Sequence, residues 1–363
     1  MEGRELIQSI LTGRGFDRFG LYEYFWPETT KSWVAQGYPM DDSGEPVDPE
    51  SFFNFDMRAC GGWFDHFPIR GFREVVEETD EWEVIRNGAG SHLKYWKHKS
   101  GTPEHIDFHM VTPEVWREEY RHHLLKPDPE RLNLEADRQK LDKARQAGKW
   151  SFFGHVFLWE TMRPSLGDVC MFESYALEPE WIHDYHRVHT DFFKSHFDLL
   201  LQGAGMSDAV AIYEDLSYRN GLFVSPKMLE ELLLPYYVEL VSWLHDKGLK
   251  VHFHSCGNIT EAIPLLIQAG FDSLNPMEVK AGCDLYSFVR SFGDKLAFLG
   301  GFDVRILETN DKDLVQGKIK ERLEEMKRMG ARHIFASDHS IPPSVKFDTY
   351  RWALDAFWQN CRV

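Results

Sequence analysis

The sequence lacks an excess of positive charge, and this weighs against a nucleic-acid partner. Lysine and arginine together number 41, against 58 aspartates and glutamates, so the formal net charge is −17. Proteins that bind DNA or RNA neutralise phosphates with clustered basic side chains. We therefore expect no nucleic-acid binding, and we interpret the acidic surface as a source of solubility.

A long hydrophobic run is also missing. No stretch of about 18 consecutive apolar residues occurs, so the sequence predicts no membrane-spanning helix. The opening segment MEGRELIQSILTG has no apolar core of the kind that signal peptides carry. These absences lead us to expect a cytoplasmic protein that does not associate with membranes.

Cysteine is scarce and irregularly placed. The chain has five cysteines, an odd number, and their spacing shows no disulfide framework. In a reducing compartment such cysteines are free thiols or metal ligands rather than cross-links. They stand at positions 60, 170, 256, 283 and 361.

Two phosphate-binding motifs are absent as well. No G-x-G-x-x-G follows a predicted strand and no P-loop occurs, which weighs against an open, doubly wound nucleotide-binding sheet. What the 363 residues do contain is ample apolar material for a large core, with 43% hydrophobic residues and 14% aromatic residues. The question is therefore how that core is built.

Short apolar runs alternate with longer amphipathic stretches along the second half of the chain. Strict β–α alternation predicts parallel strands joined by right-handed crossovers. Eight predicted strands make the number that a (β/α)8 TIM barrel requires. They cover residues 19–25, 52–57, 151–159, 209–215, 249–254, 271–275, 295–299 and 332–337. Residues 225–248 are predicted to form one helix, capped by Ser225 and ended by Gly248.

We interpret residues 1–363 as a single barrel domain with an N-terminal extension. Residues 81–149 are predicted to form an insertion between the second and third strands. Its first part, 81–101, has the pattern of a hairpin with an Asn87-Gly88 turn. Residues 112–149 are charged and helical in pattern, which fits a cover over the barrel mouth, an oligomer contact, or simply a solvated helix pair.

Polar residues follow nearly every predicted strand. Active sites of such barrels form at the carboxyl-terminal rim of the strands, so convergence of these residues predicts a catalytic pocket there. In strand order, from the second to the eighth, the residues are Asp56; Trp159, Glu160 and Arg163; Glu214 and Asp215; His254 and Cys256; Asn275; Asp303; and Asp338 and His339.

The fifth predicted strand carries the pattern KVHFHSC. Strand side chains alternate between faces, so His252, His254 and Cys256 share one face. We expect His252 in the packed interior, and His254 and Cys256 at the mouth. An imidazole and a thiolate at this spacing suit Zn²⁺, which takes nitrogen and sulfur ligands and keeps a fourth position open in catalytic sites. The alternative is a buried histidine and cysteine without metal.

The third zinc ligand has to come from another strand, and four residues qualify on position: Glu214, Asp215, Asp338 and His339. Glu214 and Asp215 could equally serve as a proton relay or cap the following turn. Among the other rim residues, we predict that Asn275 and Asp303 position the substrate and that Trp159 and Arg163 contribute to its pocket. Tryptophans near the mouth favour an apolar or aromatic ligand, although such residues commonly belong to a core.

Four segments together resemble the uroporphyrinogen decarboxylase superfamily in order and spacing. They are PYYVELVSWLHDKGLKVHFHSCGNI, FDSLNPMEVKAGCDL, LAFLGGFDVRIL and FASDHSIPPSV. The resemblance implies a TIM barrel. True decarboxylases of this superfamily carry an arginine pair after the first strand that grips substrate carboxylates. That pair is missing here, and Asp56 alone matches the family's aspartate near the second strand.

A second branch of the superfamily contains zinc methyltransferases that act with corrinoid proteins. Its H-x-C zinc motif matches His254 and Cys256. The branch's second cysteine aligns with His339, so the resemblance implies His254, Cys256 and His339 as the zinc ligands, with His339 departing from the family pattern. It also implies methyl transfer between a small methylated (O-methyl) substrate or a thiol and cobalamin on a separate protein, because this chain has no D-x-H-x-x-G corrinoid motif. The family's habit of pairing suggests a homodimer.

Two other functions fit the same sequence. One is a metal-free decarboxylase or lyase acting on a smaller acid, with Asp56 and His339 as its acid–base groups. The other is a non-catalytic binding protein on the same scaffold. Metal content separates the first of these from the zinc methyltransferase.

Overall fold

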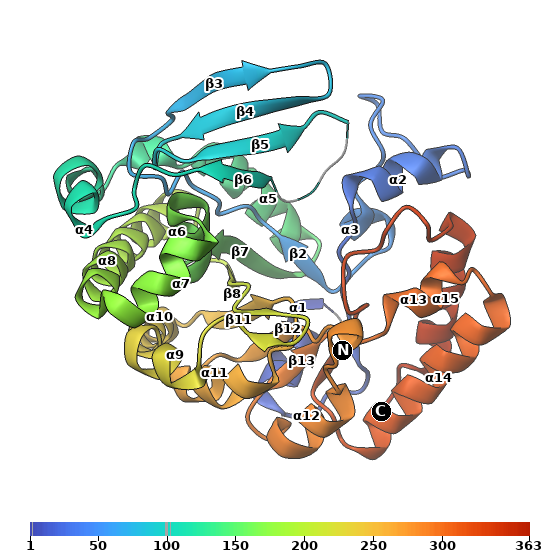
Figure 1. Cartoon of the computed structure of the whole chain (residues 1–363). Helices are drawn as coiled ribbons and strands as arrows, with labels where there is room; N and C mark the ends of the chain where they lie inside the picture. Colours follow the sequence, from blue (N-terminus) through green and yellow to red (C-terminus); the bar gives the residue numbers. More distant parts are fainter. Residues whose placement is uncertain (2, 99–100, 102) are drawn as a thin grey trace.

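Eight parallel strands form the centre of the molecule and confirm the predicted TIM barrel (Figure 1). The structure is a computed structural model that describes residues 1, 3–98, 101 and 103–363. The strand order is β1-β14-β13-β12-β11-β8-β7-β2, with every neighbouring pair parallel. The strands are β1 (Gly20–Leu21), β2 (Met57–Ala59), β7 (Trp150–Val156), β8 (Ala209–Tyr213), β11 (Lys250–Ser255), β12 (Ser273–Pro276), β13 (Ala297–Leu299) and β14 (His333–Phe335).

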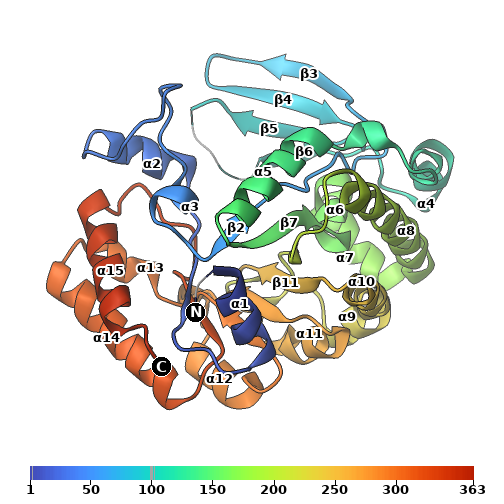
Figure 2. The same ribbon diagram turned by 180° about the vertical axis from the view of Figure 1, so that it is seen from behind.

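Helices surround this sheet, and α1 (Gly3–Thr12) packs at the end where the strands begin, as Figure 2 shows from behind. No helix in the described part of the chain is long and apolar enough to cross a membrane. The remaining barrel helices are α2 (Pro27–Val34), α3 (Pro49–Phe52), α5 (Leu134–Gln146), α6 (Leu158–Leu166), α7 (Asp168–Leu177), α8 (Pro179–Gly203), α9 (Pro226–Leu232), α10 (Leu234–Asp246), α11 (Ile263–Ala269), α12 (Leu285–Phe292), α13 (Val304–Glu308), α14 (Lys312–Arg328) and α15 (Phe347–Asn360).

The single helix predicted over residues 225–248 is wrong, because two helices occupy this stretch. Ser225 caps α9 as expected, accepting a hydrogen bond from the Met228 backbone N–H. The chain then breaks at Leu233, and α10 begins with Pro235 in its first turn. Proline has no N–H to donate to the preceding turn, and its ring collides with the carbonyl four residues earlier.

The second predicted strand is also displaced. The aromatic run at 52–57 predicts a strand, yet residues 49–52 form α3 and the strand starts only at Met57. Asp48 caps α3 by accepting from the backbone N–H groups of Glu50 and Ser51, and Pro49 occupies the first helical position. These local start signals override the β-propensity of the phenylalanines.

The ends of the sheet, β1 and β2, meet along a seam that side chains hold together. At its lower end the Leu21 N–H donates to Asp56 Oδ2, and the Asp56 N–H donates to the Leu21 carbonyl. Further up, Glu50 accepts from the Tyr22 hydroxyl at 2.6 Å and from the Ala59 N–H at 3.3 Å. At this seam, hydrogen bonds to the carboxylates of Asp56 and Glu50 thus replace part of the backbone hydrogen bonding that joins the other strands.

A four-stranded antiparallel sheet, ordered β3-β4-β5-β6, stands beside the barrel between β2 and β7 in the sequence (Figure 1). The predicted hairpin is present as β4 and β5, which pair around Asn87, although residues 99 and 100 of the predicted 81–101 stretch lie outside the described residues. The sheet begins at Arg73, earlier than the predicted start at 81, and the division into one domain with an insertion stays a prediction. Its strands are β3 (Arg73–Glu78), β4 (Trp82–Asn87), β5 (His92–Trp96) and β6 (Glu104–Asp107).

Between this sheet and β7 the chain forms short helical turns before α5. They are α4 (Pro113–Val115), η1 (Trp116–Tyr120), η2 (Arg121–Leu124) and η3 (Pro129–Arg131). Ser91 Oγ donates to the Ser165 carbonyl at 2.8 Å, which ties the antiparallel sheet to α6. At the barrel rim lie a small hairpin and two turns, namely β9 (Ser217–Tyr218), β10 (Gly221–Leu222), η4 (Thr260–Ala262) and η5 (Val279–Ala281).

Candidate metal centre

Strand β11 carries the predicted pair to the carboxyl end of the barrel. His252, deeper in the strand, is 6% exposed and lies between the Trp150 indole and the Ser273 hydroxyl, so its predicted place in the hydrogen-bonded interior is confirmed. Two residues later His254 reaches the mouth, where its Nε2 lies 3.5 Å from Cys256 Sγ. Alternation along a strand thus sends one histidine to the core and the next to the site.

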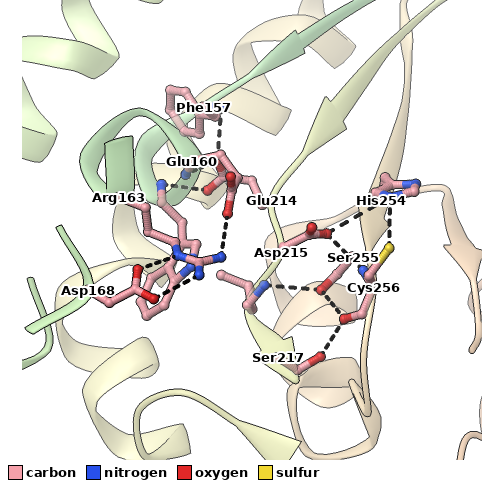
Figure 3. Close-up of polar contacts among 12 residues, drawn as sticks. Phe157, Glu160, Arg163, Asp168, Glu214, Asp215, Ser217, His254, Ser255 and Cys256 are labelled. Atoms are coloured by element: carbon pink, nitrogen blue, oxygen red, sulfur yellow. Dashed lines mark hydrogen bonds and ion pairs between the residues drawn. The ribbon is translucent and has the colours of Figure 1, made fainter. Parts of the chain in front are cut away.

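Asp215, at the end of the neighbouring strand β8, completes a group of three potential metal ligands. Its Oδ1 lies 3.9 Å from His254 Nε2 and accepts the Cys256 backbone N–H at 2.9 Å. One ligand atom from each of Asp215, His254 and Cys256 lies within 4.8 Å of the other two. Figure 3 shows the three side chains pointing toward one another.

The sulfur and nitrogen atoms of this group are spaced as the ligands of a tetrahedral zinc ion are, and the carboxylate oxygen lies slightly farther from the nitrogen. With Zn–N near 2.0–2.1 Å and Zn–S near 2.3 Å, neighbouring ligand atoms of such an ion lie about 3.4–3.6 Å apart. The observed separations are 3.5 Å between sulfur and nitrogen and 3.9 Å between nitrogen and oxygen. Three protein ligands of the types oxygen, nitrogen and sulfur also match a catalytic zinc site with one position left open.

Asn275 fixes which nitrogen of His254 faces the site. The Asn275 side-chain NH₂ donates to the Leu299 carbonyl at 3.0 Å, which leaves its oxygen toward His254. His254 Nδ1 lies 2.5 Å from that oxygen and must therefore carry the proton and donate it. Nε2 then presents its lone pair to Asp215 and Cys256, as a metal ligand requires.

Burial sets the protonation of the site in the absence of metal. It lowers the pKa of His254, although Asp215 and Asn275 act in the opposite direction. Burial and the charge of Asp215 together raise the pKa of the Cys256 thiol well above its usual value. A metal ion reverses the second effect, because it stabilises the thiolate and releases the thiol proton.

His339, predicted as the third ligand, is not one of this group of three among the described residues. Its charge still reaches His254, whose pKa it lowers. Its ring lies 6.0 Å from the ring of Trp26. The group contains Asp215, one of the four candidates for the third ligand, and not His339, which the resemblance implied. Asp338, another candidate, is fully buried and accepts the backbone N–H groups of Val279 and Val304.

Glu214, predicted to act as a ligand or proton relay, is instead engaged within the fold. Its carboxylate is fully buried and accepts a hydrogen bond from the Tyr237 hydroxyl at 2.6 Å. It also accepts from three backbone N–H groups at the start of α6, those of Phe157, Trp159 and Glu160 (Figure 3 draws part of this network). Glu214 thus acts as a cap that positions α6, with no capacity left for a metal.

The predicted position of Asp56 at the end of a strand is wrong. Asp56 precedes β2, at the end of the barrel opposite the mouth, because the strand starts later than predicted. Its carboxylate is 3% exposed, pairs with Arg18 at 2.8 Å and accepts the N–H of Gly3 in α1. This placement gives Asp56 a structural role and removes it from the candidate site.

Two residues predicted to position substrate have partners in the protein. Asn275 orients His254, as described above. Asp303 caps α13 by accepting the Arg305 N–H at 3.0 Å, and it pairs with the Arg305 guanidinium at 2.7 Å. Their contact with a substrate stays a prediction.

Trp159 and Arg163, predicted to line the substrate pocket, belong to α6 rather than to the strand end. Trp159 is fully buried and packs on Tyr175, with ring centroids 5.2 Å apart. Arg163 donates to Asp168 at 3.0 Å and to Glu160 at 3.3 Å. Burial raises the pKa of Glu160 to about 8, which the charge of Asp215 reinforces.

Tyr213, an aromatic residue next to His254, was missed in the sequence. The ring of Tyr213 lies 5.0 Å from that of His254, and the half-exposed Trp63 lies 5.3 Å from Tyr213. The position of Tyr213 could have been predicted, because Tyr213 and His254 stand near the ends of two neighbouring predicted strands. In the structure they occupy matching positions of the paired strands β8 and β11. A cavity of about 570 Å³ opens beside Cys256, and Arg219 and Glu278 are among its lining residues.

The family model for uroporphyrinogen decarboxylase (URO-D) matches residues 171–359, just over half of the chain. The chain belongs to the URO-D family. The chain matches no curated protein sequence significantly. The matched range includes the strands that bring Asp215, His254 and Cys256 to the candidate site. Membership of this family supports an enzymatic role.

One solved structure shares the fold of this chain over almost its whole length. A methyltransferase from Methanosarcina mazei superimposes with a TM-score of 0.70 at 13% identity, covering 98% of each chain. A D-allulose 3-epimerase from Methylomonas sp. gives a TM-score of 0.34 at 14% identity, covering 64% of this chain and 84% of its own. At these identities the likeness to the first structure establishes the barrel, and the chemistry has to be argued from the site.

Proposed function

We propose that this protein is a zinc-dependent methyltransferase that moves a methyl group between a small methylated substrate, or a thiol, and cobalamin on a separate corrinoid protein. The observation that carries the proposal is the group of Asp215, His254 and Cys256 at the barrel mouth. Likeness of fold to a methyltransferase supports it further.

Each of the three residues has a defined part in this proposal. Asp215, His254 and Cys256 would hold the metal, with Nε2 of His254 already directed to it by Asn275. Zinc bound there would supply positive charge that stabilises negative charge on the attacking thiol or on the leaving methyl ether oxygen. The Cys256 backbone N–H keeps Asp215 Oδ1 in place, and the rings of Tyr213 and Tyr24 limit the approach to His254 from the barrel side.

A corrinoid protein is the partner that exchanges the methyl group in this proposal. It is supported by the resemblance to the corrinoid-linked methyltransferase branch of the superfamily. A homodimer is likewise a proposal that rests on the resemblance alone.

The competing metal-free decarboxylase loses support from the position of Asp56. That reaction would need Asp56 and His339 to act together at one pocket. Asp56 lies at the other end of the barrel, beneath α1, in a closed ion pair with Arg18. We therefore do not propose decarboxylation.

Metal analysis of the purified chain tests the proposal directly. Protein prepared without chelator should contain close to one zinc per chain. Cys256→Ala, His254→Ala and Asp215→Ala should each lose most of it, because each removes one of only three protein ligands. Cys170→Ala is a matched control, since Cys170 is also a partly exposed free thiol, and its partners are the Val111 carbonyl and the Ser174 hydroxyl rather than the candidate ligands.

A second assay separates metal binding from the reaction. Zinc-loaded protein should transfer methyl groups to or from free cob(I)alamin or methylcobalamin, and Cys256→Ala should not. Zinc bound as tightly by the Cys256→Ala variant as by the wild type would contradict the ligand set. Stoichiometric zinc without any methyl transfer to thiols or from methyl ethers would leave the metal site standing and refute the reaction.

A further inference from the structure

A second cavity lies at the seam between β1 and β2, and none of the three candidate metal ligands lines it. Its volume is about 660 Å³. Its walls come from the end of β1, from α3, from β2 and from α5. We call it the seam cavity, and its charged lining residues are Glu23, Asp48, Glu50, Arg58, Lys140 and Lys143.

Arg58, from β2, has a buried donor that no described residue satisfies. Its side chain is only 12% exposed, and Nη1 is buried without a hydrogen-bond partner. The nearest carboxylate oxygen, Oε2 of Glu50, is 3.9 Å away, which is beyond hydrogen-bonding distance. Buried charged donors are nearly always satisfied in folded proteins, so an unsatisfied one points to a water or ion that completes it.

The carboxylates of the same cavity are, in contrast, already engaged. Glu23 accepts from the N–H and the hydroxyl of Ser337, Asp48 caps α3, and Glu50 accepts from Tyr22 and the Ala59 N–H. Their acceptors are therefore directed into the fold rather than toward Arg58.

Two lysine side chains also line the cavity, and no carboxylate of the described residues holds either of them. Lys140 and Lys143 are exposed residues three positions apart on α5, so they share one side of the helix. Within the described part of the chain, no hydrogen bond or ion pair holds either ammonium group. The carboxylates of the seam cavity thus already accept hydrogen bonds, whereas its cationic groups have donors to spare. This local excess of available positive charge stands in a chain whose net charge is −17.

We propose that the seam cavity binds a small molecule through an oxyanion group, a phosphate or a carboxylate, with Arg58 as its main contact and Lys140 and Lys143 as supporting charges. The planar guanidinium presents paired donors that match the oxygens of either group. Glu50 favours the same ligand, since burial raises its pKa to about 7 and so weakens its negative charge near neutral pH.

Calorimetric titration at constant ionic strength tests this site, with inorganic phosphate as one probe and succinate as the other. Wild-type protein should bind at least one of them saturably with a one-to-one stoichiometry. Tighter binding of phosphate would identify a phosphate-bearing ligand, and tighter binding of succinate a carboxylate. Arg58→Met should weaken binding by roughly tenfold or more, the range for loss of a hydrogen bond to a charged group.

Matched variants separate specific contacts from overall charge. Lys140→Ala with Lys143→Ala should weaken binding by about two- to tenfold, because it removes two exposed charges beside the ligand. Lys320→Ala with Lys327→Ala removes two exposed lysines from α14, on another part of the barrel, and should leave binding unchanged. Should Arg58→Met fail to fold, as judged by circular dichroism, the comparison of the two lysine pairs decides.

Three results would overturn the proposal. The first is the absence of saturable binding of both probes to the wild type. The second is equal binding by folded Arg58→Met and wild-type protein. The third is equal weakening by both lysine pairs. None of these results depends on zinc or on methyl transfer, so the seam cavity and the proposed function can fail independently.

Discussion

Replacing Asn275 by leucine should weaken zinc binding without removing a ligand. Asn275 accepts the Nδ1 proton of His254 at 2.5 Å, and its own NH₂ group is anchored on the Leu299 carbonyl. Leucine has a similar volume but no acceptor. His254 would then be free to turn its ring or to carry its proton on Nε2, where it blocks the metal.

The expected size of the effect follows from this contact. Loss of a partner that orients a metal-bound histidine typically weakens metal affinity by about 10- to 100-fold, which corresponds to about 1.4–2.7 kcal/mol. Asn275→Asp keeps an oxygen acceptor and adds negative charge, so its zinc affinity should equal or exceed that of the wild type. Competition with a chromophoric zinc chelator measures all of these affinities on one scale.

Ser273→Ala provides the internal control. The same two strands pair His252 with Ser273 as they pair His254 with Asn275, and the Ser273 hydroxyl lies 2.6 Å from His252 Nδ1. This variant therefore removes an equivalent histidine partner two residues deeper, away from the candidate metal site, and should leave zinc affinity unchanged. Wild-type affinity in Asn275→Leu, or an equal loss in Ser273→Ala, would refute the assignment of Asn275 as the residue that positions His254.

Two further outcomes follow from buried groups outside the ligand set. Glu214→Ala leaves the Tyr237 hydroxyl and three backbone N–H groups at the start of α6 without an acceptor. Urea unfolding should therefore show that the free energy of unfolding falls by about 3 kcal/mol or more, and by less in Glu214→Gln. An unchanged unfolding midpoint in Glu214→Ala would contradict the role of Glu214 as a cap. Burial lowers the pKa values of His155 and His186 to about 3, so the unfolded chain binds more protons than the folded one below its histidine pKa near 6.5, and stability should fall as the pH drops from about 6.5 toward 3. The raised pKa of Glu160, about 8, acts with the opposite sign, because the folded state then holds the extra proton and stability falls as the pH rises from about 4.5 to 8. Between about pH 4.5 and 6.5 the two histidines outweigh the single glutamate, so urea titrations from about pH 4 to 8.5 should find maximum stability near pH 6.5. A steady rise of stability up to about pH 8.5 would refute the raised pKa of Glu160, and unchanged stability below about pH 6.5 would refute the lowered pKa values of the two histidines.

The barrel itself was predictable, because apolar strand patterns alternate regularly with amphipathic helix patterns in the second half of the sequence. The barrel strands β8, β11, β12, β13 and β14 each begin within two residues of the predicted start. The first half was harder for physical reasons. β1 and β2 have only two and three residues, and the signals that start α3, Asp48 and Pro49, come just before an aromatic run whose composition predicts a strand.

The sequence predicted where the candidate site lies, but not which side chains form it. Glu214, Asp215, His254 and Cys256 were all candidates because each follows a predicted strand at the barrel rim. Sequence could not decide between the two adjacent acids, because that choice depends on which way each side chain turns after β8. It also could not foresee that Trp159 would be core or that Asn275 would serve His254, since both follow from packing between distant segments.

Strand register explains why Asp215 rather than Glu214 reaches the candidate metal site. The Glu214 N–H donates to the His254 carbonyl at 2.9 Å, so the pairing of β8 with β11 continues one residue past the regular strand. Along such an extended segment successive side chains point to opposite sides. Glu214 turns outward to α6 and Tyr237, and Asp215 consequently turns toward Cys256. A slip of one residue between β8 and β11 would exchange the two acids, burying Asp215 against α6 and presenting Glu214 to His254, so the candidate metal centre depends on the same register that packs the barrel.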